Sequence, residues 1–283
     1  MVKIYCDSRN RASGTNEDFV WQIPESIDLP ESLAHIDVVL VPNVFFSIRA
    51  GFNDKIRFIE QVVTQAGGGA TFHGCQATIA PGQYNGITLA TAVQTAMRAV
   101  TNMTPPDHLK VEYDTIHAKL KFQTDSLHGS QVDIYPDGLL TSGSGNFNSA
   151  QGAHTVDPNN TQSAGKVCGL LGDAIISAIG STKPLGDSVV DVQRHHCCYV
   201  HSDLGALGSS YGPQGQSDII RRVIVDAPQN GLAIDRFTSP NDTVDVNART
   251  LRSMSFRLAG ADGETVDLHG HHWSFSLIFQ PKI

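Results

Sequence analysis

The stretch MSFRLAGADGETVDLHGHHWSFSLIF, residues 254–279, decides the fold class. Apolar and polar residues alternate in three consecutive runs, and the last run places the four alternate residues from Trp273 to Phe279 on one face. A period of two over several segments is typical of strands with one buried side. Asp262-Gly263 separates the first two runs and is a strong signal for a type I′ hairpin turn, whose two central residues need positive φ. The chain therefore ends inside a β core.

The composition is that of an ordinary folded protein with many turns. The 283 residues are 40% hydrophobic and 17% charged, and 26 glycines and 13 prolines fit short strands joined by turns. A net charge of −8 repels nucleic acid unless a basic patch overrides it. The only dense basic spot is Arg221-Arg222, which we interpret as the solvated face of a strand. We expect no direct nucleic-acid partner.

The cysteines and the first residues indicate a reducing compartment inside a cell. Five cysteines cannot all pair within one chain. The residues after Met1 form no apolar run and no small-residue cleavage site, so we expect no signal peptide. No stretch approaches the ~20 apolar residues of a membrane span.

The β character is interrupted in the middle of the chain. Residues 33–41 are almost continuously apolar, which predicts a strand covered on both faces, and another strand follows at 56–62. Gly67-Gly68-Gly69 looks like a boundary, and strands return from Ser188 onward. The sequence therefore predicts a mainly β domain, residues 1–69 and 186–283, interrupted by an inserted α+β module at 70–185.

The module holds one well-marked helix. Thr88 is a plausible N-cap, and the apolar stripe from Leu89 to Val100 has helical spacing before Pro105-Pro106 forbids continuation. The segment 168–179 fits a short helix or a strand equally well, whereas 189–202 predicts one long strand. The segments 139–163 and 204–216 are rich in glycine and polar residues and predict long loops.

One cluster contains several residues of the types that bind metal ions: His195-His196-Cys197-Cys198 with His201. Zinc favours such ligands, and His195, Cys197 and His201 share one face of a strand. However, same-face neighbours lie ~6.5–7 Å apart along a strand, which strains a single coordination sphere. Packed or half-exposed strand residues are the better interpretation, with these three as weak metal candidates.

Three further histidines, His269, His271 and His272, lie just before Trp273. They predict a pH-sensitive cluster, because histidine titrates nearest physiological pH, although a plain polar turn explains them as well.

Two catalytic motifs fail on context. Gly208–Gly212 matches G-x-S-x-G, but Pro213 follows and no helix begins, so no nucleophile elbow is expected. Gly165-Lys166 lacks the other residues of a P-loop. The sequence therefore predicts no catalytic residue, no cofactor and no enzyme.

Three groups of segments together resemble one protein family. They are 19–23, 27–29 and 35–43; then 79–84, 111–113 and 169–172; then 198–204, 217–223, 254–258, 262–263 and 273–279. Their order and spacing are similar to those of the penton (vertex, minor capsid) proteins of Maverick/Polinton elements, adintoviruses and virophages. Each pattern is made of core residues and turns, so the order supplies the specificity.

The resemblance implies a single jelly-roll barrel or sandwich with an inserted domain. It also implies a structural viral capsid protein, five copies of which form a homopentamer at the icosahedral five-fold vertex of a virion and contact the major capsid protein. The long loops would then lie at one end of the barrel, and the inserted module would either project outward or brace the neighbouring capsid proteins.

Two other function classes compete with the capsid role. A jelly-roll module that binds a receptor or glycan on a virion would use exposed aromatic residues, for which Phe147 and Tyr211 are candidates. A metal-dependent or serine hydrolase would need a convergent polar pocket. A five-fold ring in electron micrographs separates the capsid role from both.

Overall fold

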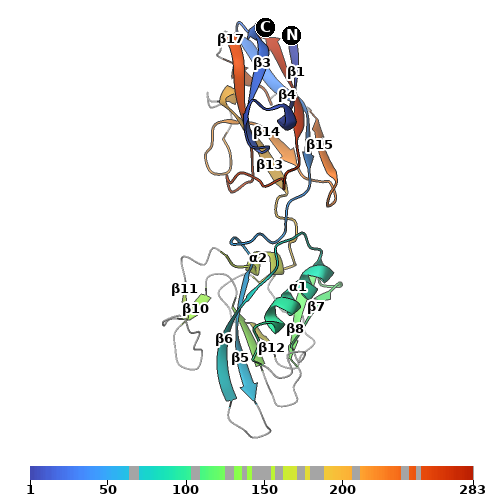
Figure 1. Ribbon diagram of the computed structural model, residues 1–283, viewed down its shortest axis with the longest axis vertical. Helices are drawn as coiled ribbons and strands as arrows, with labels where there is room; N and C mark the ends of the chain where they lie inside the picture. Colours follow the sequence, from blue (N-terminus) through green and yellow to red (C-terminus); the bar gives the residue numbers. More distant parts are fainter. Residues whose placement is uncertain are drawn as a thin grey trace. The chain divides into compact units, whose positions relative to one another are not determined.

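The computed structural model describes residues 1–63, 70–102, 109–124, 131–135, 139–141, 154–156, 162–170, 176–178, 188–205, 211–236, 242–246 and 250–282. The chain forms two compact units (Figure 1). Unit 1 comprises Met1–Phe45 and His195–Ile283, and unit 2 comprises Phe46–Arg194. Unit 2 is thus inserted between the two parts of unit 1.

Unit 1 contains two antiparallel sheets. The first sheet has the order β1 (Val2–Asp7), β18 (Ser274–Pro281), β4 (Ser32–Pro42) and β15 (Leu232–Arg236), and β16 (Val244–Val246) also pairs with β4. The second sheet has the order β14 (Ile219–Ile224), β13 (Cys197–Ser202), β17 (Thr250–Ala259), β3 (Asp18–Asp28) and β2 (Ser13–Gly14).

The strands of unit 1 form nested pairs, in which strands near the start of the chain pair with strands near its end. β1 pairs with β18, β3 with β17, β4 with β15, and β13 with β14. When a ribbon of four nested antiparallel pairs folds over on itself, it gives two sheets in the orders observed here, which is the jelly-roll arrangement. The predicted fold class, mainly β with a jelly roll, is confirmed.

The terminal stretch supplies much of the core of unit 1. Trp273, Phe275 and Phe256 are buried, as the alternation predicts. The Phe275 ring centroid lies 4.6 Å from that of Phe256 and 5.0 Å from that of Trp273, and Phe19 of β3 completes the cluster 5.6 Å from Trp273. Aromatic rings at such separations add stabilisation beyond the area that they bury.

The predicted type I′ hairpin at Asp262-Gly263 is wrong in detail. The chain does turn there, and the Gly263 N–H donates to the Gly260 carbonyl over 3.0 Å, but only Gly263 has positive φ, at 77°. Val266 then donates to the Leu258 carbonyl over 3.0 Å, and no full strand follows. The chain crosses to the other sheet instead, because β18 pairs with β1 and β4 rather than with β17.

Unit 2 has its own sheet and its own core. Its four-stranded sheet has the order β12 (Ile176–Ala178), β9 (Gln131–Tyr135), β5 (Lys55–Val63) and β6 (Ala70–Thr78). Two hairpins accompany it, β7 (Leu109–Asp114) with β8 (Lys119–Thr124) and β10 (Leu139–Thr141) with β11 (His154–Val156), together with the short helix α2 (Gly165–Cys168).

The predicted helix is α1 (Gly86–Arg98), which contacts β6 and β7. It buries Leu89, Val93 and Met97, as the stripe predicts. Its N-cap is Asn85 rather than Thr88: the Asn85 side chain accepts from the Thr88 N–H, and the Thr88 hydroxyl accepts from the Asn85 N–H, over 2.9 Å each. None of the helices in the part of the chain that the structure describes is long and apolar enough to span a membrane.

The unit boundaries differ from the predicted ones. The chain leaves unit 1 after Phe45 and returns at His195, instead of at 69 and 186. The strand β5 belongs to unit 2, because it lies between β6 and β9. The expected long strand at 189–202 is only Cys197–Ser202, because its first residues belong to unit 2, where Val190 donates to the Ala118 carbonyl over 2.8 Å.

Candidate assembly surface of the jelly roll

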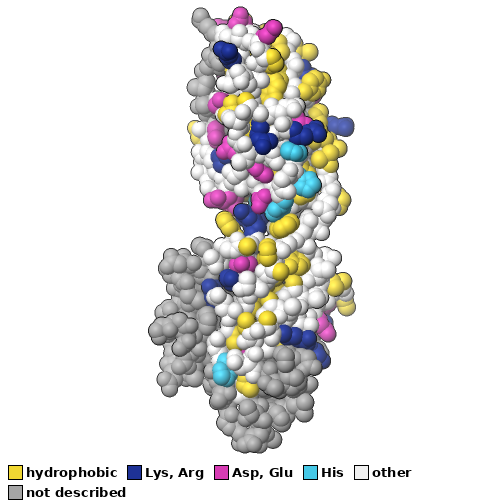
Figure 2. All heavy atoms as spheres, viewed as in Figure 1, with side chains coloured by type: hydrophobic (Ala, Val, Ile, Leu, Met, Phe, Trp, Pro, Cys, Tyr) yellow, Lys and Arg dark blue, Asp and Glu magenta, His cyan; other side chains and the backbone are white. Residues whose placement is uncertain are grey.

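An apolar patch lies on the outer face of the first sheet of unit 1. Cross-strand pairing sets Leu40 opposite Ile234 and Pro42 opposite Leu232. Leu232 and Ile234 are each 49% exposed. The β4–β15 patch consists of Val38, Leu40, Pro42, Leu232 and Ile234. Figure 2 shows hydrophobic side chains gathered along the edge of unit 1 where Figure 1 labels β15.

An irregularity at Asp37 turns part of this patch outward. The register between β4 and β18 shifts there, so that Leu277 pairs with Ile36 and Ser276 with Val38. Residues 36 and 39 are therefore buried, whereas Val38 and Leu40 are only half-buried. A strand bulge re-aims side chains in this way. The sequence predicts that both faces of this strand are covered. In unit 1 only the inner face is fully buried, and the outer face carries Val38 and Leu40, which are half-buried.

Asp37 is held by two neighbouring strands. Its Oδ2 accepts from Lys3 Nζ of β1 over 2.7 Å and from the Ser276 hydroxyl of β18 over 3.2 Å. The hydrogen bond from Lys3 holds the pKa of the Asp37 carboxyl below its usual range, and Asp37 in turn raises the pKa of Lys3. The bulge is thus fixed by a charged contact.

The outer face of the second sheet is polar by comparison. Its exposed or half-exposed residues are mostly polar, among them Asp18, Gln22 and Arg257, but Val20 of β3 is 36% exposed and Ile224 of β14 is 54% exposed. Edge strands that expose apolar side chains favour association with another chain, whereas polar faces favour water. The apolar residues of the β4–β15 patch pair across two adjacent strands, whereas Val20 and Ile224 lie on strands that are not neighbours, so the patch is the candidate assembly surface.

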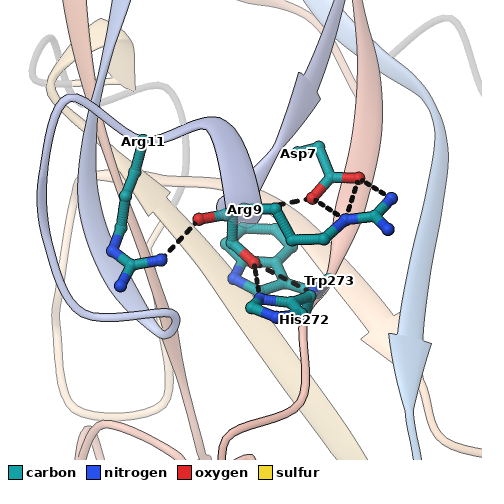
Figure 3. A network of polar contacts seen from close by, with 6 residues as sticks. Asp7, Arg9, Arg11, His272 and Trp273 are labelled. Atoms are coloured by element: carbon teal, nitrogen blue, oxygen red, sulfur yellow. Dashed lines mark hydrogen bonds and ion pairs between the residues drawn. The ribbon is translucent and has the colours of Figure 1, made fainter.

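A buried serine ties the first segment of the chain to the last (Figure 3). Ser8 lies in the 3-10 turn η1 (Ser8–Asn10) and is fully buried. Its N–H donates to the Trp273 carbonyl over 3.1 Å, and its hydroxyl accepts from the Trp273 N–H over 3.2 Å. His272 Nδ1 lies 3.5 Å from the same hydroxyl.

Two arginines flank this serine (Figure 3). Arg9 forms a two-pronged ion pair with Asp7, with its Nη2 2.6 Å from Oδ2, and this contact lowers the pKa of the Asp7 carboxyl. Arg11 Nη1 donates to the Ser8 carbonyl over 2.9 Å and to Asn16 Oδ1 over 2.8 Å. These contacts fix the chain that leads into β18.

A buried charge lies at the edge of the sandwich, between β14 and β15. Arg221 Nε donates to Asp235 Oδ2 over 2.7 Å, its Nη1 to Asp242 Oδ2 over 2.6 Å, and its Nη2 to the Arg236 carbonyl over 2.7 Å. The sequence interpretation of Arg221 as solvated is wrong, because its side chain is 5% exposed. Arg222, its neighbour, is exposed. A buried charge requires partners of this kind.

The three weak metal candidates have separate neighbours. The His195 ring packs edge-on against Phe45, with 4.9 Å between the centroids, and the Cys197 thiol donates to the Tyr199 hydroxyl over 3.5 Å. His201 is buried, and its Nδ1 lies 2.7 Å from Asp218 Oδ1. Among the residues that the structure describes, no group of three or more His, Cys, Asp or Glu could hold a metal ion.

The other sequence candidates lie in two loops. His269, His271 and His272 are exposed, and His269 Nδ1 lies 3.5 Å from Asp267 Oδ2, so their pH sensitivity stays a prediction. Tyr211 is described and is 78% exposed. Phe147 and the first three residues of the G-x-S-x-G match, Gly208 among them, lie outside the described residues.

The residues that sequence reasoning missed are polar ones at strand junctions. Nothing in the sequence marks Ser8 as a buried link, because its partner Trp273 is 265 residues away. Asp37 carries a weak signal, since it interrupts an apolar run. A search for single charges inside such runs could have indicated the bulge.

No model of a known protein family and no curated protein matches the chain. Among solved structures, its fold is similar to the crystal structure of the selenomethionine-labelled mavirus penton protein, with a TM-score of 0.52 and 10% sequence identity. The match covers 99% of this chain and 99% of that one. The chain therefore shares its fold, over nearly its full length, with a viral penton protein.

Proposed function

We propose that this protein is a structural capsid protein of a virion, five copies of which form a ring at the icosahedral five-fold vertex. The observation that carries the proposal is the similarity in fold to the mavirus penton protein over 99% of both chains. The ring would contact the surrounding major capsid protein. A resemblance in sequence order to the Maverick and adintovirus pentons supports the same role.

The β4–β15 patch gives the proposed ring a contact surface. A five-fold ring needs a heterologous contact, in which one surface of each copy meets a different surface of the next. The patch joins apolar residues of adjacent strands and the other sheet is mostly polar on its outer face, so the two faces of one jelly roll differ, as such a contact requires. The occupant that we assign to the patch is a second copy of this chain.

A charge placed in the patch tests this proposal. We expect Ile234→Glu to weaken self-association by about tenfold or more, because an unpaired carboxylate would be buried at the contact. The control is Ile116→Glu in unit 2, since Ile116 is 87% exposed and lies in the turn between β7 and β8. Native mass spectrometry and electron micrographs of purified protein report the copy number.

Two results would contradict the proposal. The first is a wild-type chain that stays monomeric at the highest soluble concentration and with added major capsid protein. The second is a ring with a copy number other than five. An Ile234→Glu variant that assembles like wild type would keep the ring and remove the patch from it.

A further inference from the structure

A cavity of about 380 Å³ lies beside β14 in unit 1 and is lined by residues of both sheets, Val244 of β16 among them. Its wall includes Tyr199 of β13 and Arg222 of β14, which the sheet register sets opposite each other. Tyr211 comes from the loop between β13 and β14, and Asp242 and Thr243 come from the segment before β16. The volume lies in the range of small-molecule sites, and convergent polar groups among aromatic rings are typical of such sites.

The walls of this cavity are fixed by the protein itself. Arg221, whose side chain is 5% exposed, holds Asp242 by one hydrogen bond, from its Nη1 to Asp242 Oδ2 over 2.6 Å. The loop that carries Tyr211 is closed by hydrogen bonds from Gly212 N–H to the Gln216 carbonyl over 2.7 Å and from Gly215 N–H to the Gly212 carbonyl over 3.0 Å. Asp242 is therefore held in place before a ligand binds, which lowers the entropy lost on binding.

The exposed groups of the cavity define the ligand. Tyr211 is 78% exposed and offers an aromatic face. Arg222 forms no ion pair with any residue that the structure describes, whereas the charge of Arg221 is shared by Asp235 and Asp242. A guanidinium recognises a carboxylate through two parallel hydrogen bonds. The ligand should thus combine a ring with one apolar face, hydroxyl groups for Asp242, and a carboxylate for Arg222.

We infer that this cavity binds the terminal unit of a carboxylate-bearing saccharide. A sugar ring presents C–H groups on one face, which pack on a tyrosine ring, and hydroxyl groups at its rim, which bond to carboxylates and hydroxyls. This function goes beyond the proposed structural one: it would attach the protein to a glycosylated surface.

The test uses the full-length protein on an array of matched neutral and carboxylate-bearing saccharides, followed by calorimetric titration of the strongest binder. We expect acidic saccharides to bind and Tyr211→Ala and Arg222→Ala each to weaken binding about tenfold or more. The matched control is Arg252→Ala, an exposed arginine of β17 that does not line the cavity, and it should bind like wild type. Tyr211→Phe should also bind nearly normally, because it keeps the ring.

Three outcomes would overturn the inference: no saccharide bound, neutral saccharides bound as tightly as acidic ones, or binding that neither Tyr211→Ala nor Arg222→Ala weakens. If Arg222→Ala fails to fold, Tyr211→Ala decides alone, because Tyr211 lies on an exposed loop. The copy number of each variant is measured in parallel. A normal ring without saccharide binding rejects this inference and leaves the capsid proposal standing.

Discussion

Asp37 decides which residues of β4 face outward. Without an extra residue at this position, strict alternation would carry Val38 and Leu40 to the same side as buried Ile36. The register shift beside Asp37 reverses which alternate residues of β4 face the core, so that Val38 and Leu40 face outward. Lys3 and Ser276 hold the Asp37 carboxylate on the same outer side. One charged residue thus makes an apolar strand available for a contact.

The charge of Asp37 should appear in the pH dependence of stability. Lys3 holds the pKa of Asp37 below its ordinary value of 3.8, so this carboxylate stabilises the fold above that pH and loses its effect as the pH falls through the lowered value. We expect Asp37→Asn to lower the Tm of unit 1 by a few degrees at pH 7, and this difference from wild type to shrink as the pH falls below 3.8.

Tryptophan fluorescence measures this effect cleanly, because both tryptophans, Trp21 and Trp273, belong to unit 1. The control is Asp226→Asn, an exposed aspartate that should leave the Tm unchanged at every pH. A difference between Asp37→Asn and wild type that stays constant or grows as the pH falls below 3.8 would contradict the argument.

At the residue scale, the sequence predicted burial better than it predicted geometry. The alternate positions from Trp273 to Phe279 are buried as the period required. The turn at Asp262-Gly263 is present but has positive φ only at Gly263, because the hydrogen bond from the Gly260 N–H to the Glu264 carbonyl encloses three residues, and a three-residue loop places only its last residue in the left-handed region. The bulge at Asp37 needs a partner strand that local sequence does not name.

At the element scale, α1 shows how a helix can be located correctly and begun at the wrong residue. The apolar stripe fixes its buried face, but both Asn85 and Thr88 are capping residues by type. The pair forms a capping box, in which each side chain bonds to the other residue's N–H. Sequence alone could not assign the two roles.

Asn85→Ala should destabilise unit 2 by about 0.5–2 kcal/mol, because the Thr88 N–H loses its acceptor. Unit 2 contains no tryptophan, so the measurement is amide hydrogen exchange of the first turn of α1, with far-UV circular dichroism for global unfolding. The control is Thr91→Ala, an exposed position inside the helix, which should be neutral or slightly stabilising. Equal exchange in Asn85→Ala and wild type would contradict the capping role.

Strand assignments went wrong where the sequence could not say which sheet a strand joins. The alternation at 56–62 predicted a strand correctly, but Ile56 and Phe58 pack into the core of unit 2 rather than the jelly roll. The period of two reports one buried face and nothing about the partner. For the same reason the sequence predicted that residues 189–196 belong to the strand that begins only at Cys197.

At the scale of the whole molecule, the front and back of the chain build one sandwich and the middle builds a separate core. The sequence predicted this arrangement from the change in character, but the insertion extends further toward both chain ends than predicted, to 46 and 194, because β5 and the segment before His195 pack in unit 2. The two ends of the insertion lie close together within unit 1, since the rings of Phe45 and His195 are 4.9 Å apart.

This geometry predicts that unit 1 folds without its insertion. A chain in which a Gly/Ser linker of about five residues replaces 46–194 should keep the native emission of Trp21 and Trp273, because their neighbours all belong to unit 1. If the β4–β15 patch forms the ring, the shortened chain should also assemble, and Ile234→Glu should weaken that assembly as in the full chain. Emission typical of an unfolded chain would show that unit 1 needs unit 2 in order to fold. A folded but monomeric product would assign the ring contact to unit 2, and the contact proposed for β15 would then be wrong.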